Sequence, residues 1–148
     1  MANMRKRKKE EGFTLIELIV VVAILGFLLA IAIPRYMTAR EQGAAAATKA
    51  NLHNLATALE LYLTERSAEL PEDDEAFWEA IADYVPQKPV PPKDGNYTYT
   101  KVDDDSYRIV DPNPYTIGGQ TRYFWVEESG ILREGSEPPG SGEGEQQS

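Results

Sequence analysis

The sequence predicts an α+β protein. One long N-terminal helix, apolar in its first half and amphipathic in its second half, packs on a small antiparallel sheet of three or four strands. An unbroken apolar run followed by apolar residues at helical spacing predicts the helix. Alternating apolar and polar residues in the second half of the chain predict the strands. We expect five segments: a basic leader (1–12), a membrane-length helix (13–34), an amphipathic helix (35–66), a globular head (67–134) and a disordered acidic tail (135–148).

Charge is distributed unevenly along the chain. The 148 residues carry a formal charge of −9, and residues 1–12 hold five Lys/Arg and two Glu, so residues 13–148 carry −12. Proteins that bind nucleic acid need clustered Lys and Arg to displace counterions from phosphates, so we expect no direct nucleic-acid binding. The basic run directly precedes the apolar segment, which is typical of a flank that stays in the cytoplasm.

The apolar run extends from Phe13 to Ile33 and includes the acidic residue Glu17. These 21 residues form a helix of roughly 30 Å, the thickness of the hydrocarbon core of a bilayer. The positive-inside rule places the N-terminus in the cytoplasm and residue 35 onward outside the cytoplasmic membrane. Two plainer interpretations stay open: a secretory signal peptide with its cleavage site at Ala30-Ile31-Ala32, and a single-pass anchor that tolerates the acid near the interface.

The hexapeptide Gly12-Phe13-Thr14-Leu15-Ile16-Glu17 joins the charged segment to the apolar one. An acidic side chain near the bilayer centre costs on the order of 3 kcal/mol, so Glu17 needs a partner. The hexapeptide and the run behind it resemble the processing site of type IV prepilins. The resemblance implies that a prepilin peptidase cuts between Gly12 and Phe13 and then methylates the new amino group of Phe13.

The same resemblance gives roles in assembly to Glu17 and Pro34. Glu17 would pair with the terminal amine of a neighbouring subunit, which neutralises two charges that are each costly in lipid. Proline removes one backbone hydrogen bond, so we expect a kink or local melting around residues 30–34. Whether this region is a simple kink or a segment that extends in a filament stays open.

Helical periodicity resumes after Pro34 and ends before Pro71. Apolar or small residues recur every three or four positions, as expected for one buried face: Ala45, Thr48, Leu52, Leu55, Leu59 and Tyr62. We therefore predict one long, bent helix over residues 13–66, with its second half lying on a sheet. His53, the single histidine, is expected to be a surface residue and not a ligand or base.

The remaining chain predicts a short helix and then strands. Residues 71–86 suit a helix with acidic residues at its N-terminal end and Pro86 after it. Residues 87–92 read as an extended, proline-rich connector. Strand patterns follow, with a longer loop over 111–120; the strand residues are Tyr97–Thr100, Tyr107–Ile109, Tyr123–Val126 and Ile131–Arg133.

The acidic run Asp103-Asp104-Asp105 connects the first two predicted strands. Carboxylate oxygens are ligands for hard cations, which makes these residues weak candidates for calcium, although a solvated turn explains them better. The resemblance extends to the pilin fold, an apolar helix joined to an α/β head. Two features of some family members are missing: cysteines for a disulfide, and aspartate or tryptophan in the stretch from Ile131 onward for a calcium loop.

Nothing in the chain indicates catalysis or a cofactor. There is no cysteine, and no serine stands in a recognisable nucleophile context. The resemblance implies a type IV pilus-like filament subunit, with a pseudopilin of type II secretion as the alternative. A membrane-tethered binding or hydrolytic domain is a second alternative. The implied partners are further copies and other pilin-like subunits, prepilin peptidase, an assembly platform protein with its ATPase, and membrane lipid.

Overall fold

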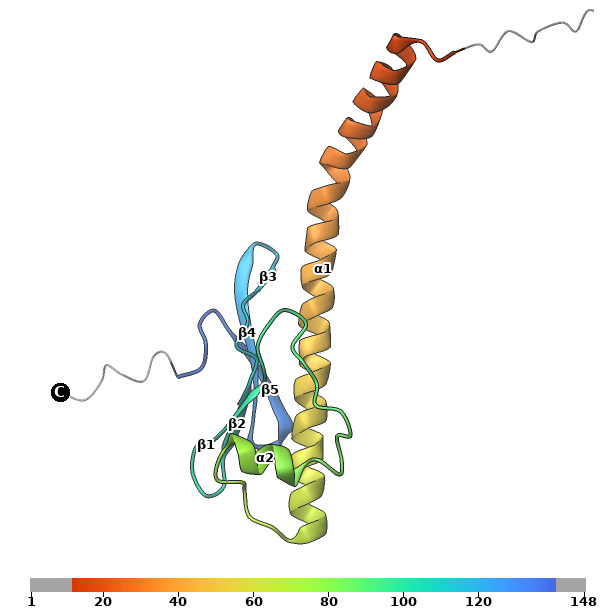
Figure 1. Ribbon diagram of the computed structural model, residues 1–148. Coiled ribbons are helices and arrows are strands. Elements are labelled where there is room, and N and C mark those ends of the chain that lie inside the picture. Colours follow the sequence, from red (N-terminus) through yellow and green to blue (C-terminus); the bar gives the residue numbers. More distant parts are fainter. Residues whose placement is uncertain (1–11, 141–148) are drawn as a thin grey trace, which may run out of the picture. The chain divides into compact units, whose positions relative to one another are not determined.

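The computed structural model describes residues 12–140. Contacts within the chain separate two units, residues up to Met37 and residues from Thr38 onward. The long helix α1 (Leu15–Arg66) runs through both units, and the remaining elements belong to the second (Figure 1). The predicted α+β fold, with a long N-terminal helix on a small antiparallel sheet, is confirmed.

In the first unit, α1 is apolar all round and its side chains are exposed. The exposed fraction of its large apolar residues ranges from 48% at Val21 to 75% at Leu15. The helix is long and apolar enough to cross a membrane, which fits a single-pass anchor. The local melting expected around residues 30–34 is not observed. The helix α1 continues through Pro34 without a break. A proline removes a single donor, and the helical bonds on either side of it can persist.

In the second unit, α1 buries one face against the sheet, as predicted. Ala45, Thr48, Leu52, Leu55 and Leu59 are all buried, and Tyr62 packs against the same core at its edge. Their spacing of three and four residues places them on one side of a helix. The core is completed by buried strand and loop residues, among them Tyr97, Tyr99, Ile109, Phe124 and Val126.

The sheet has five antiparallel strands instead of three or four. Their order is β1-β2-β4-β3, and β5 also pairs with β4. The strands are β1 (Thr98–Lys101), β2 (Tyr107–Val110), β3 (Tyr115–Ile117), β4 (Gln120–Glu127) and β5 (Ile131–Gly135), with the 3-10 turn η1 (Glu128–Gly130) before β5.

The additional strand, β3, lies in the stretch 111–120 that the sequence predicted to be a loop. Gly118 and Gly119 both have positive φ, 59° and 79°, and Ile117 lies opposite Gln120. Two central residues with positive φ form the tight hairpin turn that matches the twist of antiparallel strands. The glycines therefore close a hairpin, and the prediction of a long loop was wrong.

The helix predicted over 71–86 is shorter than expected. α2 spans Asp74–Ala80, and the side chain of Asp73 caps it by accepting a hydrogen bond from the Ala76 N–H at 2.9 Å. Beyond α2 the chain continues in tighter turns, in which the Tyr84 N–H bonds the Ile81 carbonyl at 3.0 Å. Phe77 of α2 is fully buried and stacks on Tyr99 with ring centroids 4.6 Å apart.

Gly135, the first residue of the predicted tail, still belongs to β5. Gly135 ends β5 opposite Tyr123. It also lies directly beneath the indole of Trp125, where an added Cβ would come within 2.9 Å of the ring. The close approach needs a residue without a side chain. Residues 141–148 of the predicted tail lie outside the described residues.

Candidate processing and assembly segment

The segment around Gly12 and Phe13 directly precedes α1. Both residues are exposed and outside the helix, with 90% of Phe13 accessible. The basic residues of the predicted leader, Arg5 to Lys9, lie outside the described residues. The peptide bond between Gly12 and Phe13 therefore lies in exposed, non-helical backbone two residues before α1.

Glu17 caps its own helix in the single chain. Its Oε2 accepts hydrogen bonds from the Thr14 N–H at 2.8 Å and from the Thr14 hydroxyl at 2.9 Å. In return, the Glu17 N–H donates to the Thr14 hydroxyl at 3.3 Å. This reciprocal arrangement is a capping box, in which a threonine at the N-cap and a glutamate three residues later satisfy each other's backbone donors.

The capping box bears on any role of Glu17 in assembly. A carboxylate within an apolar segment needs hydrogen bonds, and Thr14 supplies them while no neighbour is present. A positively charged partner would have to replace or join these bonds. The sequence signal for this box, Thr14 followed by Glu17 at three residues, was visible but was interpreted only as part of the processing motif.

Pro34 lies inside α1, and the helix surrounding it is intact. The structure does not bring Pro34 together with Gly12, Phe13 or Glu17, which are at the opposite end of the apolar run. The predicted site residues are thus two separate features of one helix. The first is a cluster at the helix start, and the second is a proline near the end of the membrane-length segment.

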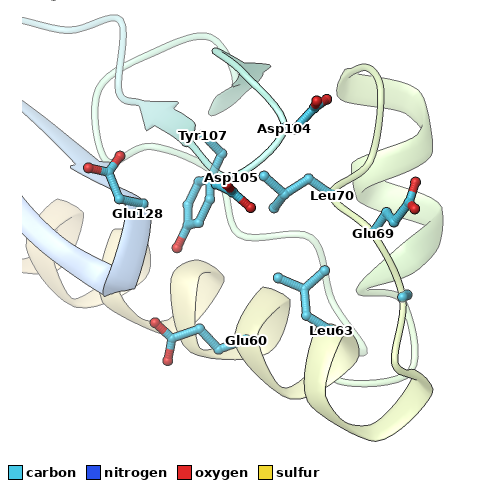
Figure 2. A pocket seen from close by; sticks show the side chains of 9 residues that line it. Glu60, Leu63, Glu69, Leu70, Asp104, Asp105, Tyr107 and Glu128 are labelled. Atoms are coloured by element: carbon cyan, nitrogen blue, oxygen red, sulfur yellow. The ribbon is translucent and has the colours of Figure 1, made fainter.

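The acidic run 103–105 forms a turn between β1 and β2. The Asp103 side chain accepts a hydrogen bond from the Asp105 N–H at 3.0 Å, and bonding to Ser106 lowers the pKa of Asp103 below its ordinary value. Asp104 lies 3.6 Å from Lys101. Asp104 and Asp105 also line a hollow in the surface (Figure 2). Between residues 12 and 140, no group of three or more His, Asp or Glu side chains is arranged to hold a metal ion.

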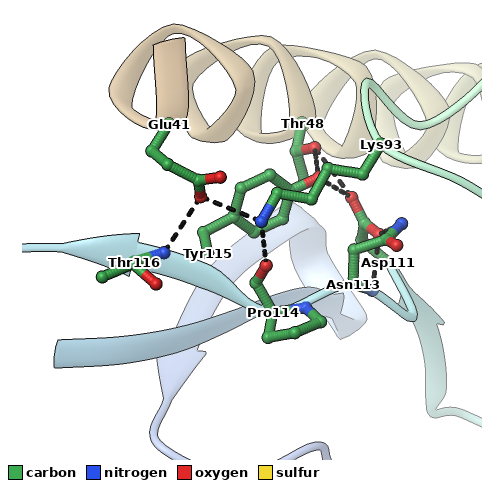
Figure 3. Close-up of polar contacts among 8 residues, drawn as sticks. All are labelled: Glu41, Thr48, Lys93, Asp111, Asn113, Pro114, Tyr115 and Thr116. Atoms are coloured by element: carbon green, nitrogen blue, oxygen red, sulfur yellow. Dashed lines mark hydrogen bonds and ion pairs between the residues drawn. The ribbon is translucent and has the colours of Figure 1, made fainter. Parts of the chain in front are cut away.

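A buried polar cluster holds the head to α1 (Figure 3). Asp111 is fully buried, and one of its carboxylate oxygens accepts hydrogen bonds from the hydroxyls of Thr48 and Tyr115, each at 2.7 Å. The other oxygen accepts from the backbone and side chain of Asn113 at 2.9 and 2.7 Å. A buried carboxylate is tolerated only when donors surround it, as they do here. The sequence analysis did not identify Asp111, because nothing local distinguishes it from a loop aspartate.

A second polar contact joins α1 to β3 beside this cluster (Figure 3). Glu41 lies 2.9 Å from the Lys93 ammonium and accepts a hydrogen bond from the Thr116 N–H at 3.1 Å. The bond to Lys93, supported by that from Thr116, lowers the pKa of Glu41. Lys93 also donates to the Pro114 carbonyl. These groups satisfy one another, so their arrangement stabilises the fold and offers no reactive group.

Comparison with known proteins points to the same N-terminal region. The profile of the family described as "Prokaryotic N-terminal methylation motif" matches residues 7–33. The chain is 38% identical over 63 residues to the type II secretion system core protein G of Pseudomonas aeruginosa, covering 43% of this chain and 44% of that protein. It is 33% identical over 94 residues to the corresponding core protein G of Vibrio cholerae, covering 64% and 60%.

A third relative is named as a pilin. The chain is 42% identical over 66 residues to the type IV major pilin protein PilA of Myxococcus xanthus, covering 45% of this chain and 30% of the pilin. The chain thus matches less than two thirds of the length of each of these three relatives.

A membrane-length apolar helix begins within the matched methylation motif and continues into the core of a small antiparallel head, an arrangement similar to that of pilin-like proteins. The motif and the named relatives support membership of the pilin and pseudopilin family. Members of this family are structural subunits and not enzymes. The tethered hydrolytic domain that the sequence left open as an alternative is not supported.

Proposed function

We propose that the chain is a structural subunit of a type IV pilus-like filament. It is inserted in the cytoplasmic membrane with its N-terminus in the cytoplasm, and prepilin peptidase cuts it between Gly12 and Phe13 and methylates Phe13. The observation that carries the proposal is the match to the methylation motif over residues 7–33, which includes Gly12, Phe13 and the first part of α1, where the apolar side chains are exposed. The partners are copies of the chain, other pilin-like subunits, and an assembly platform protein with its ATPase.

Electrostatics explains why cleavage would start assembly. Cutting before Phe13 creates a positive amine at the start of an apolar helix, and Glu17 lies about 6 Å further along the helix axis. Each charge alone is costly in lipid, and two copies that stagger by a short distance can neutralise each other's charges. In a copy without neighbours, the capping box with Thr14 stabilises the carboxylate until the amine of another copy arrives.

Replacement of Glu17 tests the proposal. We expect Glu17→Ala to be inserted and processed, because the cleavage site is unchanged, but to yield few filaments in sheared surface fractions. Mass spectrometry of the parent chain should find residues 13–148 with N-methylated Phe13. The matched control is Glu79→Ala, which removes an exposed acid of α2 and should leave filament yield unchanged. Normal assembly of the Glu17 variant, or a chain that keeps its leader beside an active peptidase, would refute the proposal.

The second candidate is a pseudopilin of a type II secretion system. Its support is the Vibrio cholerae relative, because that match extends over 94 residues and is not confined to the motif. Deletion of the gene separates the two functions. Loss of surface fibres with normal protein secretion indicates a pilus, whereas retention of secreted proteins inside the cell indicates a secretion pseudopilus.

A further inference from the structure

An acidic hollow of about 460 Å³ opens in the head (Figure 2). Its walls come from the end of α1, the segment that follows α1, the β1–β2 turn, the start of β2 and η1. Five carboxylates line it, and no Lys or Arg does: Glu60, Glu69, Asp104, Asp105 and Glu128. All of these residues belong to the second unit of the chain.

The charges of this acidic hollow are not balanced within the described part of the chain. Only Asp104 approaches a cation, at 3.6 Å from Lys101, and Lys101 is already bonded to Glu72 at 2.8 Å. The other four carboxylates form no ion pair with any residue that the structure describes. Like charges that gather around one space repel one another, and a cation that enters the space would relieve this repulsion.

Tyr107 adds an observation that is independent of the charges. The side chain is 3% exposed and lines the hollow, and its hydroxyl has no hydrogen-bond partner among the described residues. In Figure 2 the hydroxyl points toward the side of the hollow where Glu60 and Glu128 lie. The Gly130 N–H is close to the hydroxyl but does not reach hydrogen-bonding geometry. A buried hydroxyl without a partner is uncommon, and a polar atom from outside the single chain would satisfy it.

Between residues 38 and 140, Arg40 is the one Lys or Arg that forms neither an ion pair nor a ring contact; its electrostatic interaction is with Glu41, the next residue along α1, and that carboxylate already pairs with Lys93. Lys88 lies over the Trp78 ring, and all the other cations of this unit except Arg40 form ion pairs: Lys49, Arg66, Lys93, Lys101, Arg108, Arg122 and Arg133. Arg40 is exposed on α1 and has no ion pair within residues 12–140. It precedes Glu60 by 20 residues of the same helix, which corresponds to about 30 Å along the axis. Arg40 therefore cannot reach the hollow of its own chain.

We infer that the acidic hollow receives the Arg40 guanidinium of a second copy of this chain. This inference rests on the proposed filament function. Two copies with parallel α1 helices, displaced by about 30 Å along the axis, bring Arg40 of one copy level with Glu60 of the other. A guanidinium has five N–H donors in a planar fork, so it can bond one carboxylate with two donors and still offer donors to a second carboxylate or to the Tyr107 oxygen. A bare metal ion would need the compact ligand group that residues 12–140 lack.

Cysteine cross-linking tests this contact directly, because the chain has no cysteine. The double variant Arg40→Cys with Glu60→Cys is expressed in the full chain, and sheared filaments are treated with a mild oxidant. We expect a ladder of linked copies. A link within one copy is excluded, since disulfides need Cα atoms roughly 4.4–6.8 Å apart. The matched control, Arg40→Cys with Glu79→Cys, places the second thiol on an exposed acid of α2 outside the hollow and should link several-fold less.

Charge reversal provides the second measurement. We expect Glu60→Arg and Arg40→Glu each to lower filament yield several-fold, and the two together to restore it toward the parent level. Filaments that form normally with no linking above the control pair would overturn the inference and leave the proposed function intact. Absence of filaments from the unchanged chain would instead refute the proposed function.

The double charge reversal, combined with a chelator, tests whether a metal ion and not Arg40 occupies the hollow. If the double reversal does not rescue assembly, and a chelator lowers the filament yield of the parent chain as strongly as Arg40→Glu does, the hollow binds a divalent cation. That result would also overturn the inference.

Discussion

Residues 15–37 and residues 38–66 belong to one continuous helix, yet their apolar side chains have opposite surroundings. In the first part, large apolar residues such as Leu25 and Phe27 are 53% and 68% exposed. In the second part, Leu52, Leu55 and Leu59 are completely buried. Burying one such side chain contributes about 1.5–3 kcal/mol. The second part obtains this stabilisation from the sheet of its own chain, and the first part can obtain it only from lipid or another molecule.

The comparison shows how one helix can serve two purposes. A helix that is apolar all round has no preferred face, so it is suited to a surface that surrounds it. A helix with one apolar stripe fixes its rotation against a sheet and presents its polar side to water. The difference lies in the side chains of each part, because both parts are α-helical.

The largest difference should come from replacing one leucine by alanine in each part of α1. In detergent micelles, Leu52→Ala should lower the free energy of unfolding of the head by about 2–5 kcal/mol, because it leaves a cavity in a fully buried site. Leu25→Ala should leave this free energy unchanged. Fluorescence reports on the head alone, since both tryptophans, Trp78 and Trp125, belong to it. Equal losses from the two truncations would show that the two parts unfold together.

Alkaline pH should also destabilise the head and not the apolar part. Burial raises the pKa of Tyr99 and of Tyr107 to about 12. The unfolded chain releases these protons near pH 10, so stability is complete below pH 10 and falls as the pH rises toward 12, by a few kcal/mol in total. Denaturant titrations at increasing pH measure the loss. Tyr107→Phe should make the decline less steep, and an unchanged slope would contradict the assignment.

A smaller effect is expected from the buried polar cluster. Thr48→Val keeps the shape of the side chain but removes one donor from the buried Asp111 carboxylate, at a cost of about 1–3 kcal/mol. The control is Thr57→Val, because Thr57 is exposed and its hydroxyl bonds only the His53 carbonyl one turn back. Urea unfolding measured by tryptophan fluorescence distinguishes them. A Thr48 variant as stable as the Thr57 variant would show that the remaining donors suffice.

The smallest change in the free energy of unfolding is expected from replacing the helical glycines Gly43 and Gly26. Gly43 has open space around its missing Cβ, so Gly43→Ala should stabilise the head by about 0.5–1 kcal/mol through better helix propensity. Gly26 has the same open space in the apolar part, and Gly26→Ala should not change the unfolding of the head. A gain from Gly26→Ala would indicate that helix formation in the two parts is coupled.

Much of the fold could be predicted from local patterns. The buried stripe from Ala45 to Leu59 follows from spacing alone, because helical periodicity is a property of neighbouring residues. The predicted strand patterns lie within or overlap β1, β2, β4 and β5 for the same reason. The sequence did not predict β3, which pairs with β4 across two glycines. A stretch rich in glycine and proline is typical of a loop, and only the pairing shows that it contains a strand.

Less of the candidate site could be predicted. The sequence by itself determined the motif around Gly12 and Phe13, the acid at Glu17 and the membrane-length run, because each is a contiguous feature. Only the tertiary structure decided which polar groups meet in the head. Thr48 reaches Asp111 across 63 residues, and the acidic hollow combines side chains from α1, the segment after it, the β1–β2 turn, β2 and η1. Such contacts depend on how helix and sheet pack, and packing is settled by the whole core and not by any local pattern.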